Sequence, residues 1–466
     1  MEPNDIRLRH HIQLLADAGL IRAPVNTWPL MWLQVIDDVR AAREGVLEAN
    51  QRRAVEYVYS VFLRQSVNNG EWALSSADQH SPIRGFGNSM RESGLAYIGV
   101  EHIGEGLAGR IRLSKVHEPT DGDEWRTDGS YLAGLWGNWV FAVGSLDRWW
   151  GPGWETALTL SNNARPPAAL SIQRHGSEAF ESKWLSWIGP WQLTAFVGRL
   201  DDPRVIEDAY LVGAKLSFKP ADWLELGLSR TAQWGGEGRP QDFSSFKNLV
   251  LGRDNTGSDG ISRDNEPGNQ IGGVDWRFSF GGTVPFGIYG EIAGEDESGY
   301  TPSRLTATLG LDLVLSLPDS DLRVIAEYSD TATQRLTRSE PQYNTAYEHS
   351  IYRSGYRYYG QSIGASVDND SRTSTLAGLW QIGSNESLSV KIKWLELNSD
   401  GAGIVFPSGN SVAIGSSKGW YADIGYKVKF NFVEMSVGYV HYDSALVVRG
   451  IDTGDDTVEV GFNFIW

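Results

Sequence analysis

The sequence predicts an all-β transmembrane barrel of about 18 antiparallel strands, preceded by an N-terminal α-helical segment. The composition favours sheet, because it has 53 Gly, 19 Trp, 18 Tyr and 16 Phe but only 4 Met and no Cys. From about residue 72 onward, apolar and polar residues alternate with a period of two. The connections between these alternating segments are by turns short and long. Together these observations indicate one closed sheet.

The first 67 residues show a different pattern, with a helical period. Apolar residues recur at Leu8 and Ile12, and again with helical spacing across residues 32–39. Two helices are therefore predicted. Residues 54–63 fit both a third helix and a strand, and we favour the helix. This gives two parts, a helical segment at 1–67 that covers the periplasmic mouth of the barrel, and the barrel itself at 68–466.

The clearest strand spans residues 305–317. Its apolar face consists of Leu305, Ala307, Leu309, Leu311, Leu313, Leu315 and Leu317. The opposite face is polar apart from Val314. Strands of this kind are about 9 to 12 residues long, which suits a tilted strand that crosses a bilayer.

Two further features favour the outer membrane over a soluble sandwich or propeller, which would also alternate. The last strand, at 457–466, ends on Trp466 and resembles the signal by which outer-membrane proteins are recognised for insertion. Trp residues gather at strand ends, at 136–139, at 187–191 and at Trp223, where an interfacial girdle is expected. There is no run of about 18 apolar residues, so a transmembrane helix is excluded.

The predicted strands and connections give a consistent topology. The strands begin near residues 72, 93, 105, 128, 138, 168, 187, 206, 222, 269, 283, 303, 320, 372, 386, 418, 431 and 455. If the last strand ends in the periplasm, the tight connections fall on that side, with 176–186 as a longer exception. The long connections, at 117–127, 147–167, 234–268, 331–371, 399–417 and 443–454, then fall outside the cell. Residues 360–370 are assigned to a loop folded over or into the lumen.

The net charge and the predicted girdle indicate which classes of partner to expect, and the first residues bear on targeting. The formal net charge of −17 argues against nucleic acid, which requires a basic surface. The predicted girdle makes outer-membrane lipid a partner. Residues 1–5 lack the features of a signal peptide, and we interpret Met1 as an added start on a mature sequence.

Catalysis is not predicted. The eight His residues are scattered, at His10, His11, His80, His102, His117, His175, His349 and His441. None has metal-ligand spacing and no Ser–His pairing stands out, so no metal or cofactor is expected. Carboxylate pairs such as Glu295 and Glu297 are the remaining option for a glycosidase.

Ligand binding by the loops is better supported, because flat aromatic rings and planar polar groups suit sugars. The candidate binding residues are Arg148, Trp149, Trp150, Trp154, Asn162, Asn163, Arg165, Arg253, Asp254, Asn255, Tyr356, Arg357, Tyr358 and Tyr359. The arginines Arg148, Arg165, Arg253 and Arg357 are expected to orient acidic groups. An equally open alternative is that Trp149 and Trp150 belong to a girdle or a loop core.

Several segments resemble the capsule-assembly Wzi family. The most specific is Gly-Ser-Leu-Asp-Arg-Trp-Trp-Gly-Pro-Gly at 144–153, followed by Leu-Thr-Leu-Ser-Asn-Asn-Ala-Arg-Pro at 158–166. Further similar segments lie at 251–255, 268–275, 289–297 and 355–360. The resemblance implies an 18-stranded outer-membrane barrel with periplasmic helices. It also implies a lectin without turnover that anchors exported capsular or extracellular polysaccharide at the cell surface.

The leading hypothesis is therefore a non-catalytic surface lectin whose outer loops bind an exopolysaccharide, with the polysaccharide export machinery as a candidate partner. The alternative is an outer-membrane diffusion channel for oligosaccharides. A plugged lumen distinguishes the two. A third hypothesis, a barrel hydrolase, predicts convergent carboxylates or a Ser–His pair near the outer rim.

Overall fold

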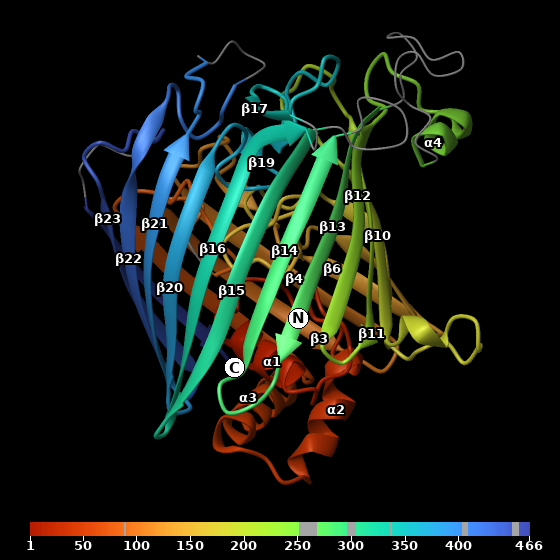
Figure 1. The fold of residues 1–466 in the computed structure, drawn as a ribbon, viewed down its shortest axis with the longest axis vertical. Helices are drawn as coiled ribbons and strands as arrows, with labels where there is room; N and C mark the ends of the chain where they lie inside the picture. Colours follow the sequence, from red (N-terminus) through yellow and green to blue (C-terminus); the bar gives the residue numbers. More distant parts are fainter. Residues whose placement is uncertain (88–89, 251–267, 296–303, 336–337, 403–408, 450–455) are drawn as a thin grey trace.

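The computed structural model describes residues 1–87, 90–250, 268–295, 304–335, 338–402, 409–449 and 456–466. Its main feature is a closed barrel in which each strand runs antiparallel to its neighbours (Figure 1). Within the described residues, 18 strands form the wall. They are β2 (Asn69–Ala77), β3 (Gly94–Ile103), β4 (Leu107–His117), β6 (Tyr131–Trp136), β7 (Trp139–Gly144), β9 (Ala169–Arg174), β10 (Trp191–Arg199), β11 (Tyr210–Ala221), β12 (Leu224–Trp234), β13 (Gly268–Phe280), β14 (Phe286–Glu295), β15 (Arg304–Leu317), β16 (Ser320–Arg335), β20 (Arg372–Ile382), β21 (Glu386–Leu397), β22 (Ser417–Phe430), β23 (Val433–Tyr442) and β24 (Asp456–Ile465). The predicted strand number is confirmed, and each predicted start lies within a few residues of an observed strand.

The barrel closes where β2 pairs with β24. Trp72 lies opposite Phe464, and the backbones of Gly70 and Trp466 exchange two hydrogen bonds of 3.0 Å. Closure leaves no free strand edge, which is the condition for a sheet to lie in hydrocarbon. The C-terminal strand thus completes the wall.

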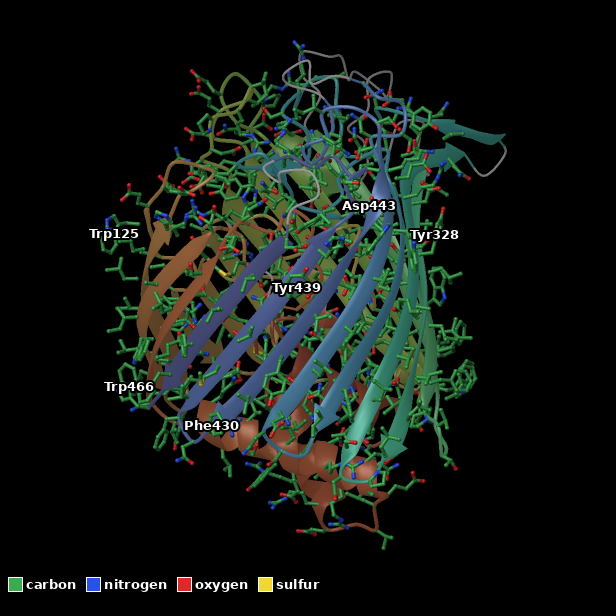
Figure 2. All side chains as sticks on the ribbon, turned by 90° about the vertical axis from the view of Figure 1, so that its left-hand side faces the viewer. Trp125, Tyr328, Phe430, Tyr439, Asp443 and Trp466 are labelled. Atoms are coloured by element: carbon green, nitrogen blue, oxygen red, sulfur yellow. The ribbon has the colours of Figure 1, made fainter. Side chains whose placement is uncertain are left out.

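The alternation of side chains along the wall follows the predicted pattern. On β15, Leu309 points outward and is 56% exposed, whereas Asp312 points inward and is fully buried. Val314, the apolar exception on the inward face, lies in the same buried cluster as the N-terminal helices. Figure 2 shows exposed aromatics at two levels of the wall, with Trp125 near one level and Trp466 near the other. This is the arrangement of interfacial girdles.

Three helices lie at one end of the barrel, which we call the helical end (Figure 1). They are α1 (Ile6–Asp17), α2 (Leu33–Arg43) and α3 (Ala49–Gln65). Asp5 caps α1 by accepting from the Leu8 amide at 2.9 Å, and Glu48 and Gln51 form a capping box at α3. The favoured third helix is confirmed. Among the described residues, no helix is both long and apolar enough to span a membrane.

The opposite end, which we call the loop end, carries the long connections together with α4 (Phe243–Val250) (Figure 1). Short elements among these connections are β5 (Trp125–Arg126), which pairs with β4, and β17 (Arg338–Gln342), which pairs with β16. β18 (Arg357–Tyr358) and β19 (Gln361–Ser362) form a hairpin of their own. The connections at the helical end are short except at 175–190, as predicted.

Residues 145–168, which we call the lumen loop, run inside the barrel. Trp154 Nε1 donates to Asp312 on β15 at 3.1 Å, and the Leu158 amide donates to Glu291 on β14 at 2.9 Å. Within the loop, β8 (Trp149–Trp150) pairs with β1 (Thr27–Trp28) of the N-terminal segment. The sequence analysis places 147–167 among the loops outside the cell; the segment does join β7 to β9 at the loop end, but it folds into the lumen instead of extending outward. The path of the lumen loop is set by its contacts with carboxylates on wall strands that are distant in sequence. The alternating pattern of the strands does not reveal these contacts.

Residues 343–371 also fold inward and cover the lumen loop. Tyr347 donates its hydroxyl to the carbonyl of Leu158 at 2.8 Å, and Asp368 and Asp370 are fully buried. The prediction that 360–370 folds over or into the lumen is confirmed. The lumen is thus occupied by α1, the lumen loop and residues 343–371.

Candidate functional site

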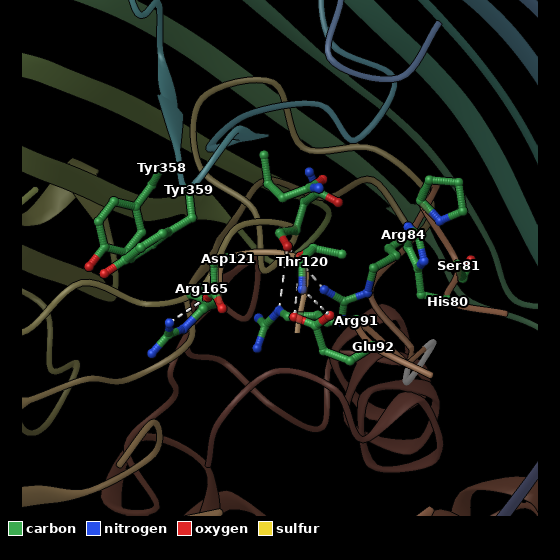
Figure 3. Close-up of a pocket in the computed structure, with 13 residues that line it drawn as sticks. His80, Ser81, Arg84, Arg91, Glu92, Thr120, Asp121, Arg165, Tyr358 and Tyr359 are labelled. Carbon is green, nitrogen blue, oxygen red and sulfur yellow. Dashed lines mark hydrogen bonds and ion pairs between the residues drawn. The ribbon is translucent and has the colours of Figure 1, made fainter. Parts of the chain in front are cut away.

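A pocket at the loop end is the candidate site (Figure 3). The empty space between its lining side chains, open solvent included, is about 380 Å³. Four connections contribute to its lining: residues 80–84 and 91–92 between β2 and β3, residues 120–121 after β4, residues 163 and 165 of the lumen loop, and residues 358–361 of the β18–β19 hairpin. The barrel fold, and not a local motif, brings these segments together.

Ion pairs form one side of the pocket. The guanidinium of Arg165 donates from Nη1 to Asp121 at 2.5 Å and to Asp123 at 3.1 Å. Its Nε donates to Asp128 at 2.9 Å. Asp121 also accepts from Arg126 at 2.8 Å, so it is shared by two guanidinium groups. Charge-assisted contacts of this kind fix the positions of the side chains.

The electrostatics keep these groups charged. Burial by itself would raise the pKa of Asp121, but the hydrogen bond from the Asp123 amide and the charges of Arg165 and Arg126 hold it below its ordinary value. Burial would lower the pKa of Arg165, but its carboxylate partners raise it well above the ordinary arginine range. The pairs therefore stay ionised at neutral pH.

Two tyrosines form the aromatic side of the pocket (Figure 3). Tyr359 is half-buried, and the guanidinium of Arg165 lies 5.0 Å from its ring centroid. Tyr358 is buried and donates its hydroxyl to Asp201 at 2.5 Å. The Tyr359 amide donates to Asp202 at 3.2 Å. These contacts fix the hairpin and leave the ring of Tyr359 partly open to solvent.

Two arginines form the remaining side, against the lumen loop. Arg84 donates to the carbonyls of Asn162 at 2.9 Å and Asn163 at 3.1 Å. Arg91 donates from Nη2 to the Asn162 carbonyl and to Asp147, both at 2.6 Å. The backbone of the lumen loop is thus clamped directly beneath the pocket.

The N-terminal segment reaches the underside of this clamp. Asn4 donates to Asp147 at 3.2 Å and accepts from the side chain of Asn162. The next residue, Asp5, is the N-cap of α1. One residue therefore separates the pocket's supporting contacts from the first helix.

A second pocket, with an empty volume of about 320 Å³, is lined in part by residues 160–167 and shares Arg165 with the first. Its lining is more apolar, with Leu160, Phe196 and Ile363. Arg148 lines it as well, with its guanidinium 4.2 Å from the Phe196 ring centroid.

Four of the residues predicted from sequence line the first pocket: Asn163, Arg165, Tyr358 and Tyr359. Asn162 does not line it, but its carbonyl accepts from Arg84 and Arg91 on the lining. The remaining predicted residues that the structure describes are not among the lining residues. Arg253, Asp254 and Asn255 lie outside the described residues, so their placement stays a prediction.

The three predicted tryptophans are fully buried inside the lumen. Trp149 Nε1 donates to the Gly153 carbonyl at 3.1 Å, and Trp150 packs edge-on against Phe196. Trp154 has the guanidinium of Arg9 at 4.4 Å from its ring. For Trp149 and Trp150 these contacts agree with the alternative of a loop core, and Trp154 is buried in the same way. A ring without accessible surface cannot stack on a sugar in this conformation.

The remaining predicted residues serve internal contacts. Tyr356 is buried and donates its hydroxyl to the Thr159 carbonyl at 2.9 Å. Arg357 is buried between Asp368 and Glu348, each at 2.6 Å. Burial lowers the pKa of Arg148 to about 10. Arg148, Arg165 and Arg357 each already contact other groups of the protein, and the expectation that they orient acidic groups of a ligand stays a prediction.

The structure adds residues that the sequence analysis missed, chiefly Arg84, Arg91, Glu92, Asp121 and Arg126. Glu92 accepts from Arg126 at 2.8 Å. The signal available in the sequence was the density of charged residues in two connections, the one after β2 and the one after β4. Within the described part of the chain, no group of three or more His, Cys, Asp or Glu side chains is arranged to hold a metal ion.

The fold and the site define a class, an outer-membrane β-barrel with an occupied lumen and a polar, aromatic pocket at its loop end. The family model of capsule assembly protein Wzi matches residues 63–454. The chain therefore belongs to the Wzi capsule assembly family.

Two comparisons describe its relatives. An uncharacterized 55.8 kDa protein in the cps region of Klebsiella pneumoniae is 34% identical over 320 residues, which are 64% of this chain and 59% of that protein. The match thus spans less than two thirds of the relative's length. A solved structure of Wzi from Escherichia coli, an outer-membrane protein involved in group 1 capsule assembly and a carbohydrate-binding β-barrel, is similar with a TM-score of 0.86 and 23% identity. The similarity covers 99% of this chain and 98% of that one, and it shows a shared fold.

Proposed function

We propose that the protein is an outer-membrane lectin that binds exported capsular or extracellular polysaccharide and anchors it at the cell surface during capsule assembly. The observation that carries this proposal is the pocket at the loop end, where the partly exposed Tyr359 lies beside closely spaced donors and acceptors. An aromatic ring and planar polar groups are the combination that sugars require. Family membership and the carbohydrate binding described for the E. coli relative support the same conclusion.

In this proposal the helical end faces the periplasm and the loop end faces outward. Residues 1–67 cover the periplasmic mouth, and residues 68–466 form the barrel and its extracellular loops. The short connections at the helical end and the long ones at the loop end agree with the usual asymmetry of outer-membrane barrels. The helices are then available to the export machinery on the periplasmic side.

The occupied lumen favours a lectin over a diffusion channel. Inward-facing side chains such as Lys215, Gln233 and Arg323 are buried, although they lie on the wall of a barrel wide enough to hold water. Binding without turnover is favoured over hydrolysis. The pocket carboxylates Glu92 and Asp121 are both paired with Arg126, and the pKa of Asp121 is lowered, whereas a general acid needs a raised one.

The test is binding of the detergent-purified full-length protein to the surface polysaccharide of its own source strain, with dextran as the control polymer. We expect the strain's polysaccharide to be retained and to show no new reducing ends after prolonged incubation. Failure to retain it would refute the lectin proposal. The appearance of new reducing ends would favour a hydrolase.

A further inference from the structure

The charges of the loop-end pocket are matched within the protein, and this bears on which sugars it can take. Three guanidinium groups, those of Arg84, Arg91 and Arg165, and two carboxylates, those of Glu92 and Asp121, line the pocket. The ion partners of these groups outside the lining are Arg126, Asp123, Asp128 and Asp147, and we count them with the lining as one cluster. Four positive and five negative groups leave the cluster with a formal charge of −1. His80, at the edge, adds no positive charge at neutral pH, because burial lowers its pKa.

Each guanidinium already has good acceptors. Arg165 contacts three carboxylates, Arg126 contacts two, and Arg91 contacts one together with a backbone carbonyl. Arg84 binds two backbone carbonyls of the lumen loop. A carboxylate on a ligand would either share a guanidinium with these partners or displace one of them, and in both cases it would lie close to the carboxylates that remain. Like charges at such distances repel, and a buried carboxylate left without its arginine is costly.

An uncharged sugar faces neither difficulty. A hydroxyl group both accepts and donates, so it can accept from a guanidinium N–H while donating to the neighbouring carboxylate oxygen. Paired arginines and carboxylates offer both partners side by side, without exchange of any existing ion pair. The partly exposed ring of Tyr359 supplies the apolar surface that the C–H face of a pyranose covers.

We propose that the loop-end pocket binds a neutral sugar residue of the polysaccharide and discriminates against uronic acids. This inference rests on the proposed lectin function and specifies the ligand class of its site. Arg165 and Arg91, together with their carboxylate partners, provide the hydroxyl contacts, and Tyr359 provides the stacking surface.

The test measures binding of matched oligosaccharide probes to the full-length protein in detergent by calorimetry. The probes are oligomers of glucose, galactose and mannose, each compared with the oligomer of its uronic acid. We expect at least one neutral probe to bind about tenfold or more tightly than its acidic counterpart. We also expect its affinity to be nearly insensitive to salt, since screening acts on charges. Equal or tighter binding of a uronate probe would overturn the proposal.

Variants tie the binding to the pocket. Tyr359→Ala should lower the affinity for the neutral probe about tenfold, because an aromatic stacking partner is lost. Tyr359→Phe should keep the affinity, because the ring remains. Asp123→Asn, at a half-exposed position, should reduce the preference for the neutral probe over the uronate probe, because it removes one carboxylate that repels the uronate. The matched control is Asp208→Asn, which alters an exposed ion pair with Arg199 after β10, away from the pocket, and should change neither affinity.

The outcomes separate this inference from the proposed function. If the strain's polysaccharide is retained but no probe binds, or if Tyr359→Ala leaves probe binding unchanged, the pocket assignment is wrong and the lectin function stands. If the polysaccharide itself is not retained, both fail.

Discussion

The attachment of α1 to the barrel wall leads to the most informative prediction. Asp17, the last residue of α1, is fully buried and accepts from Arg277 on β13 through both oxygens, at 3.0 Å and 2.8 Å. It also accepts from Ser279 at 2.7 Å. Removing one partner of a buried ion pair costs about 3–5 kcal/mol. The Asp17→Ala change should therefore raise the population with α1 detached roughly a hundred- to a few thousand-fold.

Two assays report this change. Limited proteolysis should cleave the helical segment faster in Asp17→Ala, and planar-bilayer recordings should show openings that the unaltered protein lacks. The control is Asp37→Ala, which removes an exposed ion pair with Arg40 on α2. Pairs of this kind are worth less than about 1 kcal/mol. If Asp17→Ala resists protease and stays as silent as Asp37→Ala, the buried pair does not hold the helices in place.

Three further perturbations test the interior. A Cβ at Gly310 would lie 2.2 Å from the Tyr289 ring, so Gly310→Ala should cost about 1–3 kcal/mol and lower the folded fraction seen by heat-modifiable gel migration. Burial raises the pKa of Asp370 from 3.8 to about 7. The folded protein then binds more protons than the unfolded one between these values, so this contribution to stability is complete below about pH 3.8 and lost as pH rises through about 7. Asp370→Asn should flatten that dependence in thermal melts. Trp154→Phe loses a hydrogen bond to a charged acceptor, worth about 1.5–3 kcal/mol, and should lower the melting temperature, whereas Trp136→Phe at an exposed position should not.

The barrel wall could be predicted because the sequence pattern that identifies each strand lies within that strand. Each strand carries its own alternation, and even the exception at Val314 marks a real feature, the place where the helices pack against the wall. The direction of the lumen loop could not be predicted in the same way. Trp154 donates to Asp312, a residue 158 positions later in the chain. An aromatic, Gly-rich loop has the same composition whether it faces solvent or a wall of carboxylates.

The site was predicted in part for a related reason. Residue type correctly directed attention to Arg165 and Tyr359, which line the pocket. Residue type also suggested Arg357, whose partner Asp368 lies in a stretch already predicted to fold inward. For Arg165 and Arg357, the neighbouring residues in the sequence do not indicate whether the charge is already paired within the protein. That property depends on pairs such as Arg126 with Glu92, which two different loops bring together.

The pairing of β1 with β8 has a consequence for the order of assembly. The Val25 and Asn26 amides donate to Glu225 on β12, so the segment before α2 is bound to both the wall and the lumen loop. A wall without free edges admits nothing from the side once β2 and β24 have joined. After closure, the first 30 residues and the lumen loop can reach these positions only through the two ends of the barrel.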